Sequence, residues 1–455
     1  MKVLSTSKVQ QIEKRQITPD TEKFVRNNGS YKIANIVGKA KTASPEQSSG
    51  RKTALISGAG IAALAAAFEL NAKGYDVVIT EKRDDFSRFN IINLNREAQA
   101  FLRKFNLLEE FETSVAARIN DHQIVLFGKG GTQSIATSDV SELKFEGCLN
   151  KNPMKFKDLF KEEGIYSVHI KDLQAFLAQK VVGLGVRILS ESEIKIVNPI
   201  EREKVSKIEI TQKNGSPPIT LEPDLFFIAE GTHSTSIQQL EMVNDLDDVV
   251  NNACTGENWI FGNLNYHGDK TFVLSMIITS QKILQIANVI FNAKSQVVNV
   301  AVTSDGNLNQ DEINRLILDT TQKAFNYEGI TEVPKVLETV KQPVHITNRI
   351  ASLCSRGNVF RIGDAVGHSS PLAGLGGTLG LTLVPYTVEQ LLDDHLKGSD
   401  ELHSNFKTYS QAYVKKWIDK SVSIKGVIQG IFEKDQSLVL ELKGSPQSKE
   451  AGNAI

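Results

Sequence analysis

The chain has 455 residues and a formal net charge of −1 at pH 7. This length predicts two or three domains, or two interleaved ones. A hydrophobic content of 40% with 23% charged residues is typical of a soluble globular protein. The balanced charge offers no electrostatic footprint for nucleic acid. Because no apolar run approaches the length of a membrane span, we expect no stable membrane insertion.

The three cysteines are widely spaced and odd in number: Cys148, Cys254 and Cys354. They form neither a metal-ligand pair nor a disulfide framework. We therefore expect a reducing compartment, a cytoplasmic location and no metal site.

Residues 1–50 form a polar, lysine-rich N-terminal extension that ends in a linker-like segment, TASPEQSSGRK. Its start lacks the apolar core of a secretory signal. Two interpretations stay open. We favour a disordered or loosely docked tail; the alternative is a targeting segment, or a helix that packs on the rest of the protein.

Residues 53–83, TALISGAGIAALAAAFELNAKGYDVVITEKR, predict a complete βαβ unit. An apolar run at 54–56 indicates a buried parallel strand. The pattern G-x-G-x-x-A and an alanine-rich helix follow, and a second apolar strand ends at Glu81. Strand, glycines, helix, strand and acid in this order predict a dinucleotide site.

Each part of this unit has a physical role in holding a dinucleotide. Gly58 allows a tight turn, and Gly60 lets the backbone approach a pyrophosphate, which the helix N-terminus attracts. Ala63 is small enough for the helix to pack on the strand. Glu81 is placed to accept hydrogen bonds from ribose hydroxyls.

The segment after Glu81 predicts a loop at 84–87 and a helix over 96–111. Arg83, Arg88 and Asn90 lie where the chain would pass over a bound dinucleotide, and arginines there can pair with phosphate. The alternative for these residues is an ordinary solvated surface. A helix is expected over 171–182. Strands are expected at 123–127, 186–189, 194–197, 207–211, 219–221 and 225–229.

Residues 250–305 alternate as an antiparallel sheet does, and a helix over 311–325 follows. We expect a separate substrate domain here, although the sheet could be scaffold alone. The amphipathic helix expected over 401–432 covers the core, and Trp417 in it is expected to pack.

A second signature begins with a strand at 359–362 that runs into Gly363 and Asp364. An aspartate at such a turn can bind a chain of sugar hydroxyls. Gly376 and Gly377 then open a helix, and their bare N–H groups suit the anionic edge of a ring.

These motifs together resemble the FAD-dependent monooxygenases of the p-hydroxybenzoate hydroxylase fold. The resemblance covers most of residues 53–440 and rests on GAGIAA with Glu81, on DLFFIAEG at 224–231 and on FRIGDAVGHSSPLAGLGG at 360–377. Within that superfamily, the segments at 81–90 and 169–186 look most like the flavin domain of the MICAL proteins.

The resemblance implies an α/β fold: a Rossmann-like, doubly wound FAD-binding domain interleaved with a β-sheet substrate domain and followed by C-terminal helices. The expected parts are the extension at 1–50, the first part of the FAD-binding domain at 51–235 with a short substrate-domain insertion around 120–165, the substrate domain at 236–349, the second part of the FAD-binding domain at 350–396, and a helical region with a tail at 397–455.

Family roles carry over to matching positions only. The glycine-motif residues would hold the FAD pyrophosphate, Glu81 the adenosine ribose, Asp364 the ribityl or pyrophosphate part, and Gly376 with Gly377 the pyrimidine edge. Lys171 stands where relatives carry an arginine near the phosphates. The cofactor-binding residues implied are Gly58, Gly60, Ala62, Ala63, Glu81, Lys82, Arg83, Arg88, Asn90, Lys171, Gly363, Asp364, Gly376 and Gly377.

The implied activity is a hydroxylase reaction. NAD(P)H would reduce FAD, and the reduced flavin would form a hydroperoxide with dioxygen that hydroxylates a small-molecule substrate, or alternatively a protein. The catalytic residues are unknown, because no histidine stands out as a general base. The substrate, the choice of NADH or NADPH, and the oligomeric state are not indicated.

Three alternatives remain. An FAD-dependent reductase or dehydrogenase would use the same frame without forming a hydroperoxide. A flavin halogenase is disfavoured, because Trp259 and Trp417 are isolated. A flavin-binding protein that acts through partner binding stays open, because Glu230 replaces the aspartate of the usual Asp-Gly motif and Gly367 replaces a histidine near His368.

Overall fold

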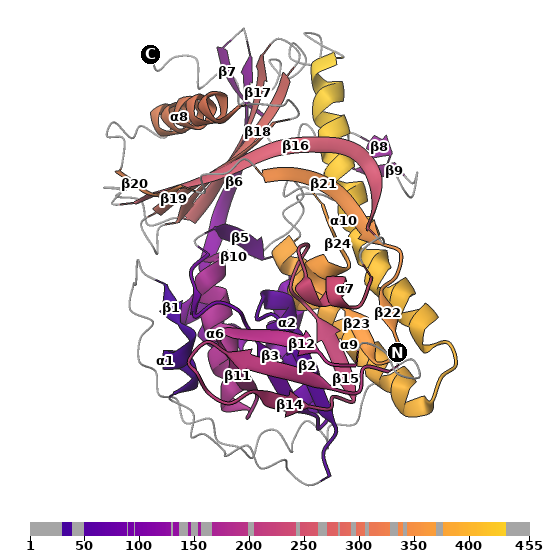
Figure 1. The fold of residues 1–455 in the computed structure, drawn as a ribbon. Coiled ribbons are helices and arrows are strands. Elements are labelled where there is room, and N and C mark those ends of the chain that lie inside the picture. Colours follow the sequence, from indigo (N-terminus) through magenta and orange to yellow (C-terminus); the bar gives the residue numbers. More distant parts are fainter. Residues whose placement is uncertain are drawn as a thin grey trace.

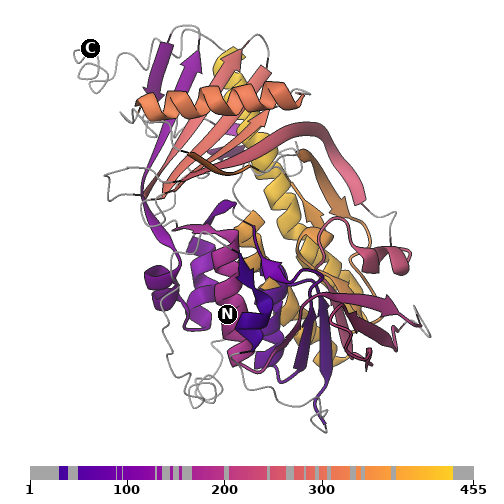
Figure 2. The same cartoon turned by 60° about the vertical axis from the view of Figure 1, so that its left-hand side comes forward.

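The computed structural model describes residues 30–38, 50–88, 90–94, 96–128, 131–135, 144–146, 153–155, 166–198, 204–242, 246–262, 271–280, 283–292, 297–304, 309–327, 335–339, 344–369 and 376–433. One part is built on a parallel sheet and the other on a larger mixed sheet (Figure 1). Helix α10 (Leu402–Glu433) runs along both parts (Figures 1 and 2). None of the described helices is long and apolar enough to cross a membrane.

The smaller sheet has the strand order β11-β3-β2-β15-β23-β22. Neighbouring strands pair in parallel, except for β22 with β23. The apolar runs form these strands because a parallel sheet that is covered on both faces buries side chains on both sides. The strands are β2 (Thr53–Ser57), β3 (Asp76–Thr80), β11 (Arg187–Leu189), β15 (Leu225–Ile228), β22 (Ser355–Arg356) and β23 (Val359–Arg361).

Different layers cover the two faces of this sheet. Ala54 and Ile56 of β2 share one hydrophobic core with helices α2 (Ile61–Ala72) and α6 (Ile170–Gly183). Leu55 belongs to a second core with the isoleucines of a three-stranded antiparallel sheet. This division follows from the two-residue period of a strand. The antiparallel sheet consists of β12 (Ser192–Ile196), β13 (Ile208–Gln212) and β14 (Ile219–Leu221).

The larger sheet has the order β24-β21-β16-β19-β18-β17-β6-β10-β5, with β20 beside β16 and β7 beside β6. The predicted antiparallel block is confirmed, since β16, β19, β18 and β17 pair antiparallel. Strand β6 extends the sheet by pairing in parallel with β17. These strands are β5 (Ile91–Leu94), β6 (Ala117–Gly128), β7 (Gly131–Ile135), β10 (Tyr166–His169), β16 (Leu246–Gly262), β17 (Thr271–Ser280), β18 (Ile283–Asn292), β19 (Val297–Ser304), β20 (Lys335–Thr339), β21 (Val344–Ala351) and β24 (Gly367–His368).

Helix α8 (Gln310–Tyr327) covers one face of the larger sheet (Figure 2). The rings of Phe291 and Phe325 meet edge to face there, with their centroids 6.0 Å apart. The side chain of Ile290, the neighbour of Phe291 on β18, therefore points to the opposite face, toward the cavity.

Two local expectations need correction. The helix expected over 96–111 is two helices, α3 (Arg96–Lys104) and α4 (Leu108–Ser114). The chain breaks between them because Asn106 adopts a left-handed conformation with φ of 57°. The loop expected at 84–87 contains a short strand, β4 (Asp85–Phe86).

The N-terminal extension docks on the fold over the part that the structure describes. Residues 31–37 form strand β1 (Tyr31–Lys32) and helix α1 (Ile33–Val37), and Ile33 is fully buried. The expectation of a loose tail is therefore wrong for these residues. Residues 1–29 and 39–49 lie outside the described residues.

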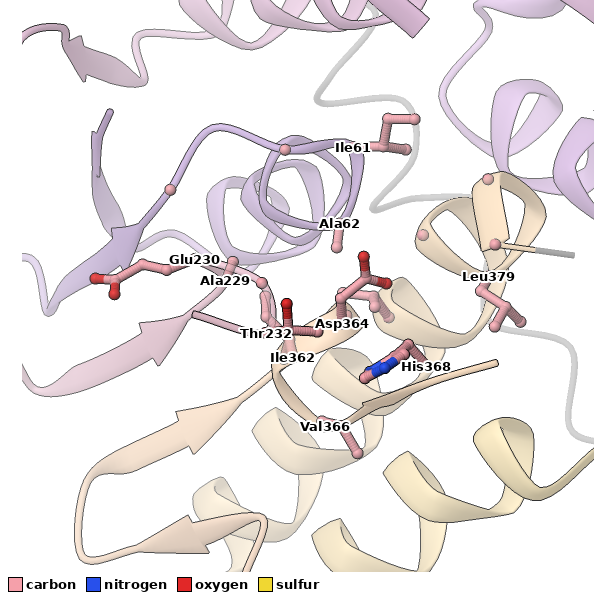
Figure 3. Close-up of a pocket in the computed structure, with 18 of the residues that line it drawn as sticks. Ile61, Ala62, Ala229, Glu230, Thr232, Ile362, Asp364, Val366, His368 and Leu379 are labelled. Carbon is pink, nitrogen blue, oxygen red and sulfur yellow. The ribbon is translucent and has the colours of Figure 1, made fainter. Parts of the chain in front are cut away.

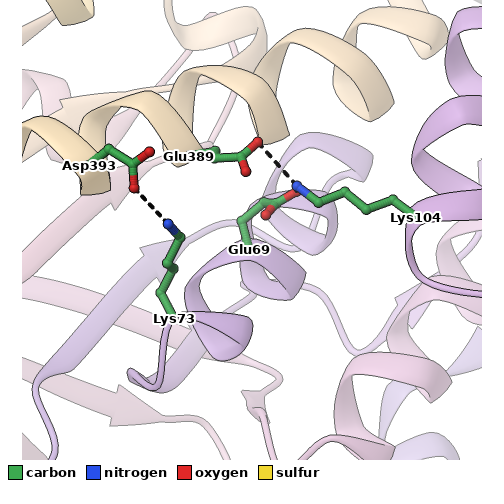
Figure 4. A network of polar contacts seen from close by, with 5 residues as sticks. All are labelled: Glu69, Lys73, Lys104, Glu389 and Asp393. Carbon is green, nitrogen blue, oxygen red and sulfur yellow. Dashed lines mark hydrogen bonds and ion pairs between the residues drawn. The ribbon is translucent and has the colours of Figure 1, made fainter. Parts of the chain in front are cut away.

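A network of charged side chains links α2 and α3 to helix α9 (Gly376–Lys397) (Figure 4). The Nζ of Lys104 lies 2.7 Å from Oε1 of Glu69 and 3.2 Å from Oε2 of Glu389. The Nζ of Lys73 lies 2.7 Å from Oδ1 of Asp393. Since α2 and α9 each follow one of the two glycine-rich signatures, the network fixes these signatures relative to each other.

Candidate cofactor and substrate site

A cavity of about 1370 Å³ lies between the parallel sheet and the larger sheet. Ligands in open α/β sheets bind at the carboxyl ends of the strands, and this cavity lies there. Its volume exceeds the roughly 300–1000 Å³ of an ordinary small-molecule pocket, so it has room for a dinucleotide and a second molecule. Residues from both sheets line it, among them Ser57, Thr80, Ala229, Ile290, Asn299 and Arg349.

The first glycine motif forms one wall of the cavity. Gly58 has a φ of +97°, and a Cβ there would lie 2.6 Å from the carbonyl oxygen of Ala229, so only glycine fits. Gly60 caps the N-terminus of α2, and a Cβ there would meet no atom within 4 Å. A helix N-terminus beside open space, with no capping side chain, is suited to a phosphate.

Glu81 is held rigidly at the end of β3. It is 5% exposed, and its Oε2 accepts a hydrogen bond of 2.9 Å from the N–H of Ala59 within the glycine motif. Its Oε1 accepts hydrogen bonds from the backbone N–H and the Nε–H of Arg83, both at 3.1 Å. The carboxylate thus lies on the cavity wall next to the glycine motif.

The second signature meets the first inside the protein. Gly363 has a φ of +62°, and a Cβ there would lie 2.8 Å from the Cβ of Ala62. Asp364 accordingly lies beside Ala62 (Figure 3). A Cβ at Gly377 would lie 2.4 Å from Cδ1 of Ile92. Glycine at 363 allows the Gly-Asp turn to approach α2 closely, and glycine at 377 allows the start of α9 to approach β5.

Asp364 opens into the cavity rather than to the outer surface of the protein. Burial raises its pKa, and the guanidinium of Arg88 opposes that rise. Burial also lowers the pKa of Arg88, as does repulsion from Arg83, whereas Asp364 and Glu81 raise it. Two arginines and two carboxylates therefore surround the expected cofactor position.

Glu230 follows β15 beside Gly58, and hydroxyl groups satisfy its carboxylate. Its carboxylate accepts hydrogen bonds from the hydroxyls of Ser57, Ser234 at 2.6 Å and Ser236 at 2.5 Å, and from the Ser236 N–H at 3.1 Å. Burial raises the pKa of Glu230, but these hydrogen bonds outweigh burial and lower it below its ordinary value. The glutamate thus has a structural role between β2 and α7 (Thr235–Gln239).

All the predicted cofactor-binding residues line the cavity except two. Ala63 is fully buried in the core, as its predicted packing role requires. Lys171 is 3% exposed, and its Nζ lies 5.2 Å from the ring centroid of Tyr31 and 3.5 Å from Oδ1 of Asp172. The N-terminal extension therefore covers Lys171, which the structure does not place on the cavity wall.

The larger sheet and α10 form the other side of the cavity. Ile290 and Asn299 face each other across β18 and β19, and Arg349 pairs with His368 between β21 and β24. Trp417 is 6% exposed and also lines the cavity. A Cβ added at Gly376 would lie 3.2 Å from its ring. The packing expected for Trp417 is present, and the same residue forms part of the wall.

Sequence reasoning missed Gln174 as a site residue. Its side chain is 2% exposed, lines the cavity and donates a hydrogen bond of 3.2 Å from Nε2 to the carbonyl oxygen of Ala59. The sequence signal for it is a polar residue between Leu173 and Phe176, on the buried face of a predicted helix.

These observations fit FAD. Open space above Gly60 suits a pyrophosphate, Glu81 and Asp364 suit sugar hydroxyls, and Arg88 adds positive charge beside the phosphates. The loop at 370–375, which holds Pro371, lies outside the described residues.

Comparison with known proteins agrees with this geometry. Residues 51–421 match the family described as FAD binding domain. No significant match is found among curated proteins. The fold is similar to PqsL, a probable FAD-dependent monooxygenase from Pseudomonas aeruginosa, with a TM-score of 0.59 at 16% identity over 84% of this chain and 100% of that one.

Two further solved structures share the fold. For p-nitrophenol 4-monooxygenase PnpA from Pseudomonas putida, the TM-score is 0.59 at 16% identity over 88% of this chain and 92% of that one. For CmlS, a flavin-dependent halogenase, the TM-score is 0.56 at 16% identity over 80% of this chain and 63% of that one. Because the fold supports both chemistries, these likenesses show architecture alone. From the family match and the geometry of the cavity, the chain belongs to the FAD binding domain family and is an FAD-dependent oxidoreductase with the fold of the p-hydroxybenzoate hydroxylase-type monooxygenases.

Proposed function

We propose that the chain is a monooxygenase that uses NAD(P)H and dioxygen to hydroxylate a small molecule. The observation that carries this proposal is the continuity of one cavity from the cofactor motifs to the inner face of the larger sheet. In the balanced reaction, one oxygen atom of dioxygen enters a C–H bond of the substrate. The other leaves as water: NAD(P)H supplies both electrons as a hydride, and one proton from solvent completes the water.

Bound FAD supplies the redox chemistry, which is hydride acceptance and activation of dioxygen. The chain's own residues bind and orient the cofactor. In this proposal the helix α2 N-terminus at Gly58 and Gly60 holds the pyrophosphate with Arg88, and Glu81 holds the ribose. Asp364 accepts hydrogen bonds from the ribityl chain. The remaining contacts are assigned to Ala62, Lys82, Arg83, Asn90, Gly363, Gly376 and Gly377.

The substrate lies, in this proposal, between the flavin and the larger sheet. Ile290 and Trp417 provide apolar surface, while Asn299 and Arg349 offer polar groups. This combination suits an electron-rich ring with a polar or acidic substituent. Amide groups at the start of α9 would stabilise negative charge on the pyrimidine edge of the ring. The likeness of residues 81–90 to the MICAL loop, and with it a protein substrate, stays a prediction.

An oxygen-uptake assay tests the proposal. The flavin-loaded protein is supplied with NADH or NADPH and a panel of small aromatic and heteroaromatic compounds under ¹⁸O₂. Mass spectrometry then detects incorporated oxygen. Substrate-dependent oxygen uptake with one ¹⁸O atom in the product is the expected result.

Other outcomes would contradict the proposal. Substrate reduction that proceeds without oxygen would identify a reductase, and a halide-dependent product would identify a halogenase. A flavin-loaded protein that oxidises neither NADH nor NADPH with any compound would favour a role in partner binding.

A further inference from the structure

The N-terminal segment pairs with the loop that carries the predicted cofactor residues. We name residues 30–38 the N-terminal clip and residues 82–90 the cofactor loop. Strand β1 of the clip pairs antiparallel with β4 of the loop, with Tyr31 opposite Phe86. The N–H of Ile33 donates a 2.9 Å hydrogen bond to the carbonyl of Asp84. The clip thus adds a strand to the middle of the cofactor loop.

The clip is anchored by apolar burial. Ile33 and Phe86 are both 0% exposed and belong to the same hydrophobic core. Helix α1 also packs against α6. Burial of a side chain of this size contributes about 1.5–3 kcal/mol. The ion pair of Lys32 with Asp84, whose side chains are 51% and 48% exposed, adds little by comparison.

A second anchor joins the clip to the first turn of α6. The hydroxyl of Tyr31 hydrogen-bonds to the carboxylate of Asp172, and its ring lies beneath the ammonium group of Lys171. Burial, the charge of Asp172 and this hydrogen bond all raise the pKa of Tyr31, so the phenol remains a donor at physiological pH.

The two ends of the cofactor loop are held by the body of the protein. The N–H groups of Ile170 and Lys171 donate to the carbonyls of Asn90 and Arg88, both at 2.9 Å. At the other end, the N–H of Ser192 donates to the carbonyl of Glu81 at 2.9 Å, and that of Glu191 to the carbonyl of Arg83 at 3.2 Å. The clip supplies the pairing between these two attachments.

We propose that the N-terminal clip positions the cofactor loop, so that Arg83, Arg88 and Asn90 face the cavity before FAD binds. The residues of the clip are positioning residues: Tyr31 and Ile33 do not line the cavity. Without the clip, the middle of the loop samples other conformations. The apparent dissociation constant for FAD then rises in inverse proportion to the competent fraction.

Single substitutions in the full chain test this proposal. Ile33→Ala weakens the clip, and Ile317→Ala is the matched control. Ile317 is also 0% exposed, but it lies on α8, on the far side of the larger sheet. Tyr31→Phe removes only the hydrogen bond to Asp172. FAD affinity is measured by titration of the FAD-free protein, thermal unfolding gives the loss of stability, and hydrogen exchange of the FAD-free protein reports on amides 84–90.

The expected result separates loop position from general stability. Ile33→Ala weakens FAD binding about tenfold, if the loop then holds its competent conformation about a tenth of the time, and speeds exchange at amides 84–90. Tyr31→Phe has the same effects to a smaller degree and keeps the fold intact. Ile317→Ala unfolds at a lower temperature, with affinity and loop exchange unchanged. Wild-type affinity and exchange in Ile33→Ala, or equal losses in Ile317→Ala, would overturn the proposal. The exchange measurement remains decisive whatever reaction the enzyme performs.

Discussion

The carboxylate of Asp364 and the guanidinium of Arg88 act on each other inside the cavity, although they come from opposite ends of the FAD-binding sequence. Burial raises the pKa of Asp364 and lowers that of Arg88, and each group opposes the shift of the other. For both residues burial remains the larger effect. The protein alone therefore does not fully stabilise the charged form of either group. This is expected for residues whose remaining interactions come from a bound cofactor.

Asp364→Ala should weaken FAD binding about tenfold or more. A hydrogen bond to a charged group is worth about 1.5–3 kcal/mol, and 1.4 kcal/mol is tenfold in affinity. Titration of FAD-free protein, followed by flavin fluorescence, measures the change. Asp319→Ala is the control, because Asp319 forms only a surface ion pair with Lys323 on α8 among the contacts described. Wild-type affinity in Asp364→Ala would refute the role assigned to this carboxylate.

Two glycines of the same motif should respond differently to alanine. Gly60→Ala should keep the unfolding temperature of the FAD-free protein, because Gly60 has a φ of −69° and open space at the Cβ position. It should weaken FAD binding about tenfold or more, since the methyl group would occupy space assigned to the pyrophosphate.

Gly58→Ala, by contrast, should destabilise the FAD-free protein by about 1–3 kcal/mol, because of its left-handed φ and the contact with Ala229. Thermal unfolding without FAD distinguishes the two variants. A large loss of stability in Gly60→Ala would show that its role is structural.

The local parts of the site could be predicted from sequence because short spacing fixes their geometry. Gly58, Gly60 and Glu81 belong to one βαβ unit, and the structure brings Oε2 of Glu81 to 2.9 Å from the N–H of Ala59. The approach of Gly363 to Ala62 depends on the whole fold. The sequence indicated the two motifs that contain Gly363 and Ala62, but not that these residues lie side by side in space.

The N-terminal clip could not be predicted for a different reason. Strand β1 has two residues and α1 has five, which is too short for hydrophobic periodicity. Such elements are stabilised by tertiary contacts rather than by intrinsic propensity. The burial of Lys171 could not be predicted either, because it depends on Tyr31 of the clip, which covers the Lys171 side chain.

Glu230→Gln should destabilise the protein at neutral pH by about 1.5–3 kcal/mol, the value of hydrogen bonds to a charged group. The folded-state pKa of Glu230 lies below its ordinary value of 4.5. Its stabilising contribution is therefore fully present above about pH 4.5 and is lost as the pH falls through the folded-state pKa.

Urea unfolding at pH 7 and below pH 4 measures this contribution. The difference between wild type and Glu230→Gln should shrink at the lower pH. Glu222→Gln, at an exposed glutamate, should show no difference at either pH. A deficit that does not depend on pH would mean that the charge of Glu230 contributes nothing.

Lys104→Ala should destabilise the protein through Glu69, which is 2% exposed (Figure 4). Burial raises the pKa of Glu69, and Lys104 opposes that rise. Because the folded-state pKa is raised, the associated stability is fully present below the unfolded-state pKa, near 4.5, and is lost as the pH rises through the folded-state value. Removing Lys104 enlarges this loss, so we expect a deficit of about 1–3 kcal/mol at pH 7 and a smaller one at pH 4.

A second substitution separates charge from packing at this site. Glu69→Gln in the Lys104→Ala background should recover most of the lost stability at pH 7, because it removes a buried charge that has lost its partner. Replacing glutamate with glutamine should therefore raise stability at Glu69 in this background. It should lower stability at Glu230, where hydroxyl groups solvate the charge. Lys416→Ala is the control, since its ion pair with Glu97 is 3.4 Å long and its side chain is 60% exposed. If urea unfolding shows no recovery in the double variant, the stem of Lys104 contributes by packing, and its charge does not stabilise Glu69.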